Sequence, residues 1–560
     1  MAETVRHMKW WGWGEPDVAF HHDDKPALAP FVRERIGVDL DGPPQPVLGL
    51  EGLDVPPPRI GEALLEALRR AVGPDHLDQT RLDRVVHCYG KSLRDLVRIR
   101  RGDLGRLPDV VVYPADEAEV VAVLAAAVEH DAVVIPFGGG TNIVGSLEAP
   151  RTESRPILSV DMGRMARVLD VDEASNLARI EAGALGPDLE RQLNDRGWTI
   201  GHFPDSFNHS TLGGWIATRS SGMQSDKYGD IADITRGLRA VTPHGTVVVR
   251  PVPSTSTGPS VREMLLGSEG RLGIITEATV HVHRLPAQRT IIAYLYPDWS
   301  SALDAMHDIA GADLQVSVTR VSDANETAFS FATAKRAGPL SALKTAAFKT
   351  YLVRRKGFDL ARMCLSFVGH EGSPAHVKAT RRQVAQIAAR HGGVTVGSGP
   401  GTLYDQKKFD TPYIRDFLLD RGALGDVSET AAPWARLGPL YDGVSKAAAD
   451  AFAALGVRGW LMCHLSHSYH AGACLYFTFA FAPAPGVEPL DQYDVVKTAV
   501  QDAFVDNGGT LSHHHAVGRE HSRWLAQDIS PAGVRLLDVL FTGVDPGGHL
   551  NPGKILRDGG

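Results

Sequence analysis

Three consecutive histidines, His513, His514 and His515, stand in the segment SHHHAVGRE near the end of the chain. Imidazole changes its charge near neutral pH, so such a cluster could exchange protons or bind a metal. If the segment is an extended strand, His513 and His515 face one way and His514 the other, so the three cannot all ligate one ion. The sequence also lacks HExxH and CxxC patterns, and we therefore expect no metal site. A solvated polar strand is the alternative to a functional cluster.

A glycine-rich segment, PFGGGTNIVGS at 136–146, follows a β-branched run that predicts a strand. Consecutive glycines allow several backbone N–H groups to contact one anion without interference from Cβ atoms, and phosphate is the expected ligand. The segment fits neither common nucleotide motif, because Ile143 stands at the last glycine of GxGxxG and no GK[ST] follows. Taken alone, it predicts either a phosphate loop or only a tight turn.

The composition is that of a soluble globular protein: 43% of the 560 residues are hydrophobic, 22% are charged, and the net charge is -8. An acidic chain has no broad attraction for polyanions, so nucleic acid is not an expected partner. The four cysteines are scattered without a CxxC pair, which favours a reducing compartment. The opening residues show no secretory pattern and no apolar run approaches about 20 residues, so we expect a cytoplasmic protein.

The elements predicted along the chain give an α+β fold. Proline-rich punctuation and an amphipathic helix at 60–72 mark the first hundred residues as an arm that wraps the protein. From Pro108 a strand, a helix and a second strand form a β-α-β unit that ends at the glycine loop. Longer helices follow, including one at 381–393, so a second domain is expected to begin near 287.

Two further segments extend the signal of the glycine loop: PDSFNHSTLGGWIATRSSGMQSDKYGDI at 204–231 and LLGSEGRLGIITEATV at 265–280. Together, and in this order, the three segments resemble the flavoprotein family typified by vanillyl-alcohol oxidase and p-cresol methylhydroxylase. The resemblance implies a two-subdomain FAD-binding domain of the vanillyl-alcohol oxidase type with an α+β cap domain. It also implies FAD as the cofactor, held non-covalently because no attachment motif is recognisable.

The resemblance places the cofactor-binding residues in three groups, one from each segment. In that family the first loop packs on the FAD pyrophosphate, and the third segment lies along the cofactor. The matching positions are Pro136, Phe137, Gly138, Gly139, Gly140, Thr141, Asn142, Asp205, Ser206, Ser210, Thr211, Gly213, Gly214, Thr218, Arg219, Ser220, Ser221, Ser268, Glu269, Gly270, Leu272, Gly273 and Ile274.

Motifs across nearly the whole chain resemble the alkyldihydroxyacetonephosphate synthases, a group within that flavoprotein family. They include MKWWGWGEP from Met8, KGFD from Lys356, ETAAPW from Glu429 and NGGTLSHHHAVGREHSRWL from Asn507. The resemblance implies a transferase of ether lipid synthesis, which exchanges the acyl group of acyl-dihydroxyacetone phosphate for a fatty alcohol. In that group the carbon skeleton stays on flavin N5 as a covalent adduct, and no net oxidation occurs.

The same resemblance assigns roles to the titratable residues. Tyr469 in SYHAGAC matches the acid/base that takes and returns a C1 proton, a role that a phenol can fill when neighbours lower its pKa. His513, His514 and His515 match active-site residues that orient groups or exchange protons near the flavin. A buried tyrosine bonded to a backbone carbonyl is the alternative for Tyr469.

A phosphate-bearing substrate needs fixed positive charge, and arginine offers bidentate contacts to phosphate oxygens. The matching positions are Arg415 in YIRD, expected to touch the substrate, and Arg320 in TRVSD, expected to support catalysis. Structural ion pairs with Asp416 and Asp323 are the alternatives. His202, just before FPDS, is a further candidate for substrate binding near the flavin.

Three positions depart from the synthase pattern: Asn142 replaces a usual serine, His464 an arginine and His470 an acidic residue. The two histidines lie near the expected catalytic tyrosine, so a different substrate is an alternative. The enzyme would then be an FAD oxidoreductase of the same fold that dehydrogenates a 2-hydroxy acid or related alcohol. A flavin-binding protein without catalysis is a third interpretation.

These inferences divide the chain into a wrapping segment at 1–100, an FAD-binding domain at 101–287, a cap at 288–500 and a C-terminal segment at 501–560 that returns to the flavin. The expected partner is a small-molecule lipid substrate. This leaves room for peripheral membrane contact and for a homodimer.

Overall fold

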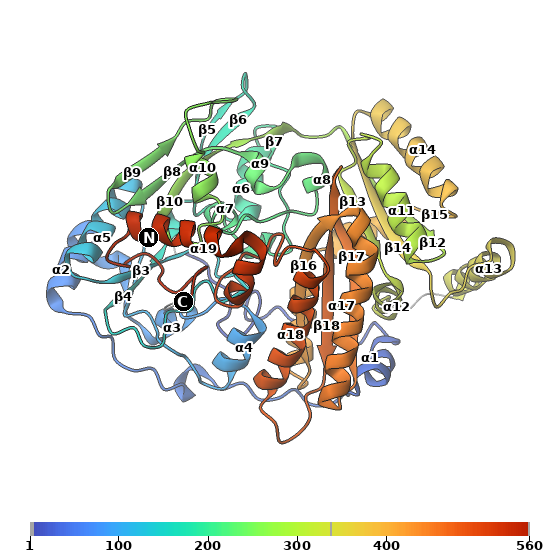
Figure 1. The fold of residues 1–560 in the computed structure, drawn as a ribbon, viewed down its shortest axis with the longest axis horizontal. Coiled ribbons are helices and arrows are strands. Elements are labelled where there is room, and N and C mark those ends of the chain that lie inside the picture. The colour runs from blue at the N-terminus through green and yellow to red at the C-terminus, as the bar shows by residue number, and fades with distance from the viewer. Residues whose placement is uncertain (1–4, 336–338, 558–560) are drawn as a thin grey trace.

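The computed structural model describes residues 5–335 and 339–557, and Figure 1 shows two α+β halves packed against each other. One half carries a four-stranded, a five-stranded and a two-stranded sheet, and the other carries one seven-stranded sheet. This arrangement confirms the predicted α+β class. The large sheet starts with β12 (Gln288–Tyr296), directly after the division expected at 287.

The four-stranded sheet contains the predicted β-α-β unit. Its spatial order is β1 (Leu77–Asp78), β2 (Val110–Val112), β4 (Ile157–Asp161) and β3 (Val133–Phe137). Strands β2 and β3 both pair in parallel with β4, and α5 (Glu117–Glu129) connects them. Asp116 caps this helix, because its carboxylate accepts a hydrogen bond from the backbone N–H of Glu119. The glycine loop therefore starts at the carboxyl edge of parallel strands.

The five-stranded sheet is antiparallel and includes part of the third predicted cofactor segment, while the second packs against it. Its spatial order is β5 (Val168–Asp172), β6 (Leu177–Glu181), β10 (Ile274–His281), β8 (Thr235–Thr242) and β9 (Gly245–Val249). Helices α6 (Gly186–Asn194) and α7 (Leu212–Thr218) share a buried core with it through Leu189, Trp215 and Ile216. The second cofactor segment contains α7, and the third leads into β10.

The seven-stranded sheet of the cap is antiparallel throughout. Its spatial order is β15 (Val394–Gly397), β12, β14 (Cys364–Gly372), β13 (Val318–Ser322), β17 (Gly459–Ser468), β18 (Gly472–Phe481) and β16 (Leu424–Pro433). Its main core forms with α11 (Trp299–Ala310), α14 (Pro374–Arg390), α17 (Trp434–Leu455) and α18 (Pro489–Asp506). Figure 1 shows these helices along one face of the sheet.

Alternation along the cap strands decides which side chains reach the interior between the halves. On β17, Cys463 and Leu465 are buried in the helix-covered core, whereas His464 and Ser466 line a cavity on the other face. On β18, Tyr476 lines the same cavity, and its neighbours in sequence belong to the core. The two-residue period of a strand thus gives the sheet one apolar and one chemically active face.

The first hundred residues contact both halves. Helix α1 (Leu28–Ile36) packs against the cap, where Leu28 and Val32 share a cluster with Phe417. Helix α2 (Glu62–Val72), predicted at 60–72, packs with α5 in the other half through Leu64 and Leu68.

The C-terminal residues return from the cap to the first half. A loop after α18 carries the three histidines, and α19 (Leu525–Val544) then packs on the core of the five-stranded sheet through Leu525 and Phe541. Further on, Leu550 forms a parallel bridge with Val134 of β3.

Other elements join these layers. They are α3 (Arg81–Val86), α4 (Leu93–Arg100), β7 (Trp198–Thr199), α8 (Ser225–Tyr228), α9 (Ile231–Ile234), α10 (Val261–Leu265), β11 (His283–Arg284), α12 (Ala324–Ala332), α13 (Pro339–Lys356), α15 (Gly399–Lys407) and α16 (Thr411–Leu419). Within the described ranges, no helix is both long and apolar enough to cross a membrane.

Candidate active site

A large cavity lies between the two halves, with about 1950 Å³ of empty space when the part open to solvent is included. All three predicted cofactor segments contribute to its wall, and the active face of the cap sheet contributes another part. Trp13 from the N-terminal arm and Asn551 from the C-terminal segment also line it.

The glycine loop is shaped by close packing against the second cofactor segment. A Cβ atom on Gly139 would lie 1.6 Å from the carbonyl oxygen of His209, and one on Gly138 would lie 2.3 Å from Thr211 Oγ1. Gly140 has a φ of +68°, which side chains disfavour. Any larger residue would therefore push the two loops apart.

Backbone N–H groups at 139–141 donate to no other group of the described chain. The loop instead is held by Asn142, whose Oδ1 accepts hydrogen bonds from the N–H groups of Val144 (3.0 Å) and Ser146 (2.8 Å). Asn142, which replaces the usual serine, therefore stabilises the loop. The N–H groups at 139–141 remain available among the described residues, and such donors bind phosphate.

Most predicted cofactor residues line the cavity. They are Pro136, Phe137, Gly138, Gly139, Gly140, Thr141, Asn142, Asp205, Ser206, Ser210, Thr211, Gly213, Gly214, Thr218, Ser220, Ser221, Glu269, Gly270, Gly273 and Ile274. Glu269 also ties the C-terminal segment to the loops, because its carboxylate accepts hydrogen bonds from the backbone N–H groups of Val517 (3.0 Å) and Gly518 (2.9 Å) and from Ser146 Oγ.

Three residues expected to bind the cofactor are placed away from the cavity wall. Arg219 ends α7 in the left-handed conformation, and its guanidinium pairs with Glu263 at 2.9 Å. Leu272 packs into the core under the five-stranded sheet, and Ser268 is buried beside it. Family motifs do not separate residues that shape a turn from residues that face its ligand.

Arg415, on α16, brings unpaired donors to the cavity. Its Nη1 donates to the backbone oxygen of Lys91 at 2.8 Å, but its Nε and Nη2 are buried without a hydrogen-bond partner. Asp416 does not satisfy them, since its Oδ1 is 3.8 Å from Nη2. The alternative of an ion pair with Asp416 is therefore present as a loose contact, but it leaves Nε and Nη2 without a hydrogen-bond partner among the described residues.

Arg320, on β13, lies in a buried polar network on the cavity wall. Its Nη2 donates to Glu326 Oε1 at 2.6 Å and lies 3.1 Å from His464 Nδ1. His464 Nδ1 is also 2.8 Å from Glu326 Oε2. Burial alone would raise the pKa of Glu326, but His464 and Arg320 lower it to about 2. Arg320 thus pairs with Glu326, and not with Asp323 as the alternative supposed.

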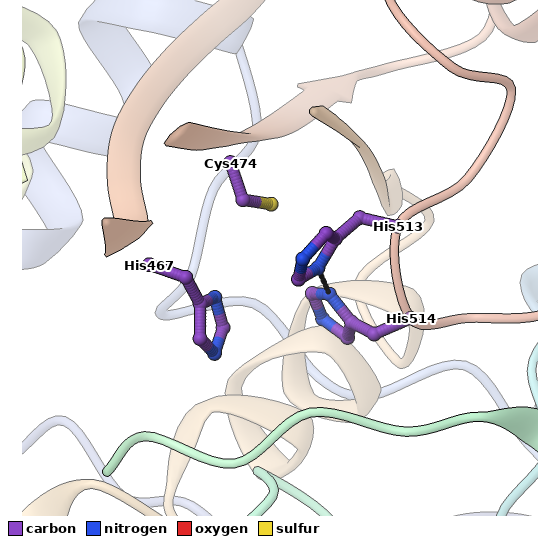
Figure 2. Close-up of side chains that lie close together, drawn as sticks. All are labelled: His467, Cys474, His513 and His514. Atoms are coloured by element: carbon purple, nitrogen blue, oxygen red, sulfur yellow. Dashed lines mark hydrogen bonds between the residues drawn. The ribbon is translucent and has the colours of Figure 1, made fainter. Parts of the chain in front are cut away.

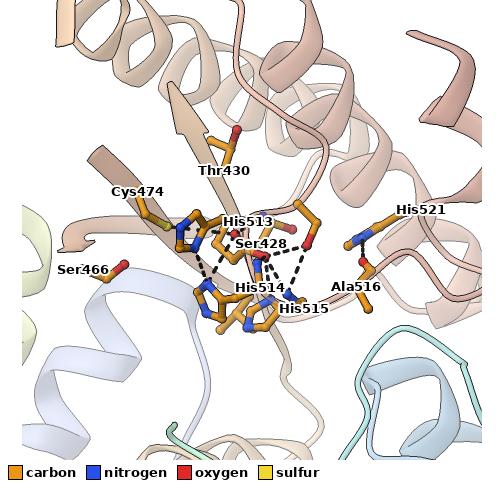
Figure 3. Close-up of polar contacts among 12 residues, drawn as sticks. Ser428, Thr430, Ser466, Cys474, His513, His514, His515, Ala516 and His521 are labelled. Carbon is orange, nitrogen blue, oxygen red and sulfur yellow. Dashed lines mark hydrogen bonds and ion pairs between the residues drawn. The ribbon is translucent and has the colours of Figure 1, made fainter. Parts of the chain in front are cut away.

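The three histidines form an irregular loop, so the expectation based on an extended strand is wrong. Their backbone N–H groups all donate to the carboxylate of Glu429 on β16, at 2.6 to 3.1 Å. Figure 3 shows the three histidines close together in this loop. Ser512 Oγ donates to the same carboxylate at 2.7 Å. Burial opposes the charge of Glu429, but the histidines and Ser512 hold its pKa well below the usual range. One buried carboxylate therefore folds the loop around itself.

Tyr469 lies in the turn between β17 and β18 and contacts this loop. Its hydroxyl donates to Asp230 Oδ2 at 2.8 Å and lies 2.6 Å from His513 Nε2. Burial, and then the charge of Asp230, raise the pKa of Tyr469 far above its usual value. The expectation that neighbours lower this pKa is wrong, because the nearest charge is negative. The alternative for Tyr469 placed its hydroxyl on a backbone carbonyl, but the hydroxyl contacts the side chains of Asp230 and His513 instead.

The contacts continue from Tyr469 toward the cavity as a chain. Since the phenol donates to Asp230, it must accept from His513 Nε2, which leaves His513 Nδ1 as an acceptor. His514 Nδ1 lies 2.9 Å from that atom and is placed to donate to it. His514 and His515 line the cavity, whereas His513 and Tyr469 lie behind them.

His202, which was predicted to bind substrate, and His470, which departs from the synthase pattern, both lie away from the cavity. His202 is fully buried behind Ser220 and Trp215, with Nε2 at 2.9 Å from Ser220 Oγ, and burial lowers its pKa to about 3. His470 is 70% exposed and pairs with Asp313. Of the two histidine departures, only His464 reaches the cavity.

Several contributors were not singled out as site residues in the sequence. Asp230 lies in the second cofactor segment and Trp13 stands in the MKWWGWGEP motif, whereas His467 and Asn551 belong to no motif that predicted them. Glu429 stands in a quoted motif, ETAAPW, but its role as the acceptor for the histidine loop follows only from the fold.

The donors present suit a dinucleotide with a pyrophosphate. Free N–H groups at 139–141 suit an anion, and the buried Oδ1 of Asn551 lacks a partner on the same wall. The residues therefore fit FAD.

Comparison with known proteins agrees with this geometry. Residues 108–250 match the model of an FAD binding domain, and residues 285–555 match that of FAD linked oxidases, C-terminal domain. An alkyldihydroxyacetonephosphate synthase of Dictyostelium discoideum is 37% identical over 99% of this chain and 94% of the relative.

Solved structures give the same result. One of an alkyldihydroxyacetonephosphate synthase superposes with a TM-score of 0.85 at 36% identity, covering 98% of both chains. The structure of p-cresol methylhydroxylase with substrate bound covers 90% of this chain and 99% of its own, with a TM-score of 0.63 at 15% identity, and so shares the fold. The predicted two-domain FAD-binding fold is confirmed, and the chain belongs to the alkyldihydroxyacetonephosphate synthase family.

Proposed function

We propose that the protein is a transferase that converts an acyl-dihydroxyacetone phosphate and a fatty alcohol into the alkyl ether, a carboxylate and a proton. The observation that carries the proposal is a single cavity that presents both Arg415, with two unpaired buried donors, and His514, the outer member of a chain of titratable groups. A phosphate recognition group and a proton-exchange group thus share one space.

Arg415 is the proposed phosphate ligand. Its Nη1 is fixed by the Lys91 carbonyl, so Nε and Nη2 remain for a bidentate contact to phosphate oxygens. Lys91 is held in turn, since its Nζ donates to the backbone oxygens of Lys9 (2.9 Å) and Trp10 (3.3 Å). The N-terminal arm therefore supports the guanidinium through Lys91.

The exchange needs removal and return of a C1 proton and acceptance of the alcohol proton. FAD, when bound, supplies an electrophilic ring that can hold the carbon skeleton while its oxygen substituent changes. His514 is proposed to take protons at the cavity and to share them with His513 through the Nδ1–Nδ1 contact. Tyr469 and Asp230 orient His513 from behind, and Glu429 fixes the loop backbone.

A lipid substrate fits the remaining wall. Between the polar groups the cavity is lined by Met223, Val318, Val427 and Pro412, which can contact an alkyl chain. This is the support for a long-chain substrate.

We also propose peripheral contact with an anionic membrane, from which such a substrate would come. Helix α13 carries five basic residues and no acidic one, in a chain of net charge -8. Its Tyr351 and Val353 are exposed, and Figure 1 shows the helix projecting from the cap. Basic and apolar groups together favour an anionic lipid surface.

The test is an anaerobic incubation with a palmitoyl ester of dihydroxyacetone phosphate and labelled hexadecanol. Labelled ether product with the flavin still oxidised at the end supports the exchange. D-Lactate or glycolate is added in a separate cell. Stable bleaching by the hydroxy acid, without ether product, would identify a dehydrogenase instead. In a parallel sample, acid precipitation should release the flavin from the polypeptide if it is held non-covalently.

A further inference from the structure

Four soft ligand groups converge at the cavity wall, where His467 and His514 line the cavity. His467, Cys474, His513 and His514 each offer a nitrogen or sulfur atom, and these atoms all lie within 4.8 Å of one another. Figure 2 shows the four side chains close together. Their shared position suggests more than proton exchange. We propose that this cluster is a binding site for a soft divalent cation of the zinc class, and that the bound ion withdraws His513 and His514 from proton exchange.

The backbone brings the four groups together from two directions. His467 on β17 and Cys474 on β18 face each other in the register of the antiparallel pair. His513 and His514 come from the loop that is folded around Glu429. In an extended strand the side chains of neighbouring residues would diverge, but His513 and His514 lie in an irregular loop that lets both reach the cluster.

Hydrogen bonds on the far side of two rings leave lone pairs facing the cluster. His467 Nε2 is placed to donate to the carbonyl oxygen of Gly222 at 3.0 Å, which leaves Nδ1 unprotonated. His513 Nε2 is placed to donate to Tyr469, whose hydroxyl donates to Asp230. Metal-bound histidines usually donate their other ring N–H to a carbonyl or to a carboxylate network in this way.

Binding an ion would require two small changes, one between His513 and His514 and one at Ser466. His514 Nδ1 already lies 2.9 Å from His513 Nδ1, and only one proton can lie between them. The hydroxyl of Ser466, which is 2.7 Å from His467 Nδ1, would turn away to admit an ion. Ligand atoms around tetrahedral zinc lie roughly 3.3 to 3.8 Å apart, so side-chain rotations of about 1 Å would complete the site.

The charges around the cluster suit a cation with one thiolate. Binding a divalent ion to three neutral imidazoles and Cys474 releases the thiol proton, and leaves one net positive charge. Glu429, whose carboxyl oxygen lies 4.0 Å from Cys474 Sγ, and Asp230 behind Tyr469 both provide negative charge. Three nitrogens and one sulfur are a donor set preferred by zinc over magnesium or calcium.

Cobalt(II) is the spectroscopic probe for this site. We expect the FAD-loaded protein to bind one Co²⁺ per chain, with intense tetrahedral d–d bands in the red, where oxidised flavin does not absorb. Zn²⁺ should abolish these bands by displacement. Absence of the bands, or bands of octahedral weakness, would overturn the proposal.

Variants of two buried cysteines locate the ion. Cys474→Ser removes the sulfur ligand and should weaken Co²⁺ binding at least tenfold, with a blue shift of the remaining bands. The matched control is Cys463→Ser, since Cys463 is equally buried on the adjacent strand but faces the helix-covered core. Equal Co²⁺ spectra in both variants would place the ion elsewhere and reject the site.

Inhibition by the bound ion is a separate readout, and it is the only part of the proposal that rests on the proposed function. Saturating Zn²⁺ should reduce exchange turnover at least tenfold, and a chelator should restore it. If the protein has no exchange activity at all, the Co²⁺ spectra still decide the metal site. Full turnover with Zn²⁺ bound at the cluster would refute the claim that the ion withdraws the histidines.

Discussion

The two sides of the cavity are built by different means. The FAD-binding side uses backbone: glycines at 138–140 allow loops to touch, and N–H groups at 139–141 remain free. The cap side uses side chains from distant strands and a loop, among them Arg320, His464 and His514. The first side depends on shape, and the second depends on where protons and charges lie.

This difference predicts two kinds of damage. A change on the FAD-binding side should remove the cofactor, whereas a change on the cap side should leave the cofactor in place and alter chemistry or substrate affinity. Each variant below tests that separation.

Gly139→Ala should have the largest effect, because its Cβ would lie 1.6 Å from the His209 carbonyl and no flexible group can yield. We expect loss of most bound FAD, measured by flavin absorbance per polypeptide, and activity falling in proportion. The control is Gly438→Ala on α17, where nothing lies within 4 Å of the added methyl. Normal FAD content in Gly139→Ala would show that the loops can separate without harm.

Tyr469→Phe should leave FAD in place but reduce turnover about 10²-fold, within the range for general acid/base groups. The loss arises because His513 would lack its acceptor behind the ring. Rapid-quench turnover and flavin content are the measurements.

The matched control is Tyr441→Phe, which removes another tyrosine donor to an aspartate, here Asp323 at 3.0 Å, outside the cavity. If both variants lose equal activity, Tyr469 has only a structural role.

Arg415→Lys should raise KM roughly tenfold and change kcat less, because lysine keeps the charge but cannot contact two phosphate oxygens at once. Arg421→Lys is the control: this arginine follows the same helix, stacks on Phe417 and donates to Leu40. Steady-state kinetics against the phosphorylated ester measure both. An unchanged KM would move the phosphate site away from Arg415.

The last effect concerns stability against acid. Burial lowers the pKa of His467 to about 4, so between about pH 6.5 and pH 4 the unfolded chain binds a proton that the native state refuses. The stabilising contribution is therefore present above about pH 6.5 and is lost as pH falls to about 4, by on the order of 3 kcal/mol.

Buried carboxyls oppose this trend, since burial raises the pKa of Asp226 to about 7. The measurement is therefore the difference in urea-unfolding free energy between wild type and His467→Gln at pH 7.5 and pH 4.5. His467→Gln should lose less stability on acidification. An identical loss in both proteins would contradict a neutral, buried His467.

The contrast between the two sides also explains what could be predicted from sequence. The glycine loop is a local feature, because Gly138, Gly139 and Gly140 are adjacent in sequence and each has no space for a side chain. Strand and helix positions at 110–137 followed from period and composition for the same reason. Arg219 shows the limit: it belongs to the motif but faces solvent, because it ends a helix.

Cap-side chemistry depends on contacts that sequence spacing does not reveal. Tyr469 meets Asp230, which is 239 residues away, and that contact sets the direction of its pKa shift. Likewise, the sequence of the three histidines is compatible with a strand. Their loop forms because the carboxylate of Glu429, 84 residues from His513, accepts hydrogen bonds from their backbone N–H groups. Residue type and motif predicted the candidate site residues, but not the contacts that set the directions of their pKa shifts.

Both ends of the described chain help to close the cavity, through Trp13 and Asn551. A ribosome releases these residues at opposite moments of synthesis, so the nascent chain holds an early wall long before it gains the late one. The complete wall therefore exists only after the segment around Asn551 has emerged and Leu550 has bridged β3 at Val134. We therefore expect stable loading of FAD to follow, and not to precede, synthesis of that segment.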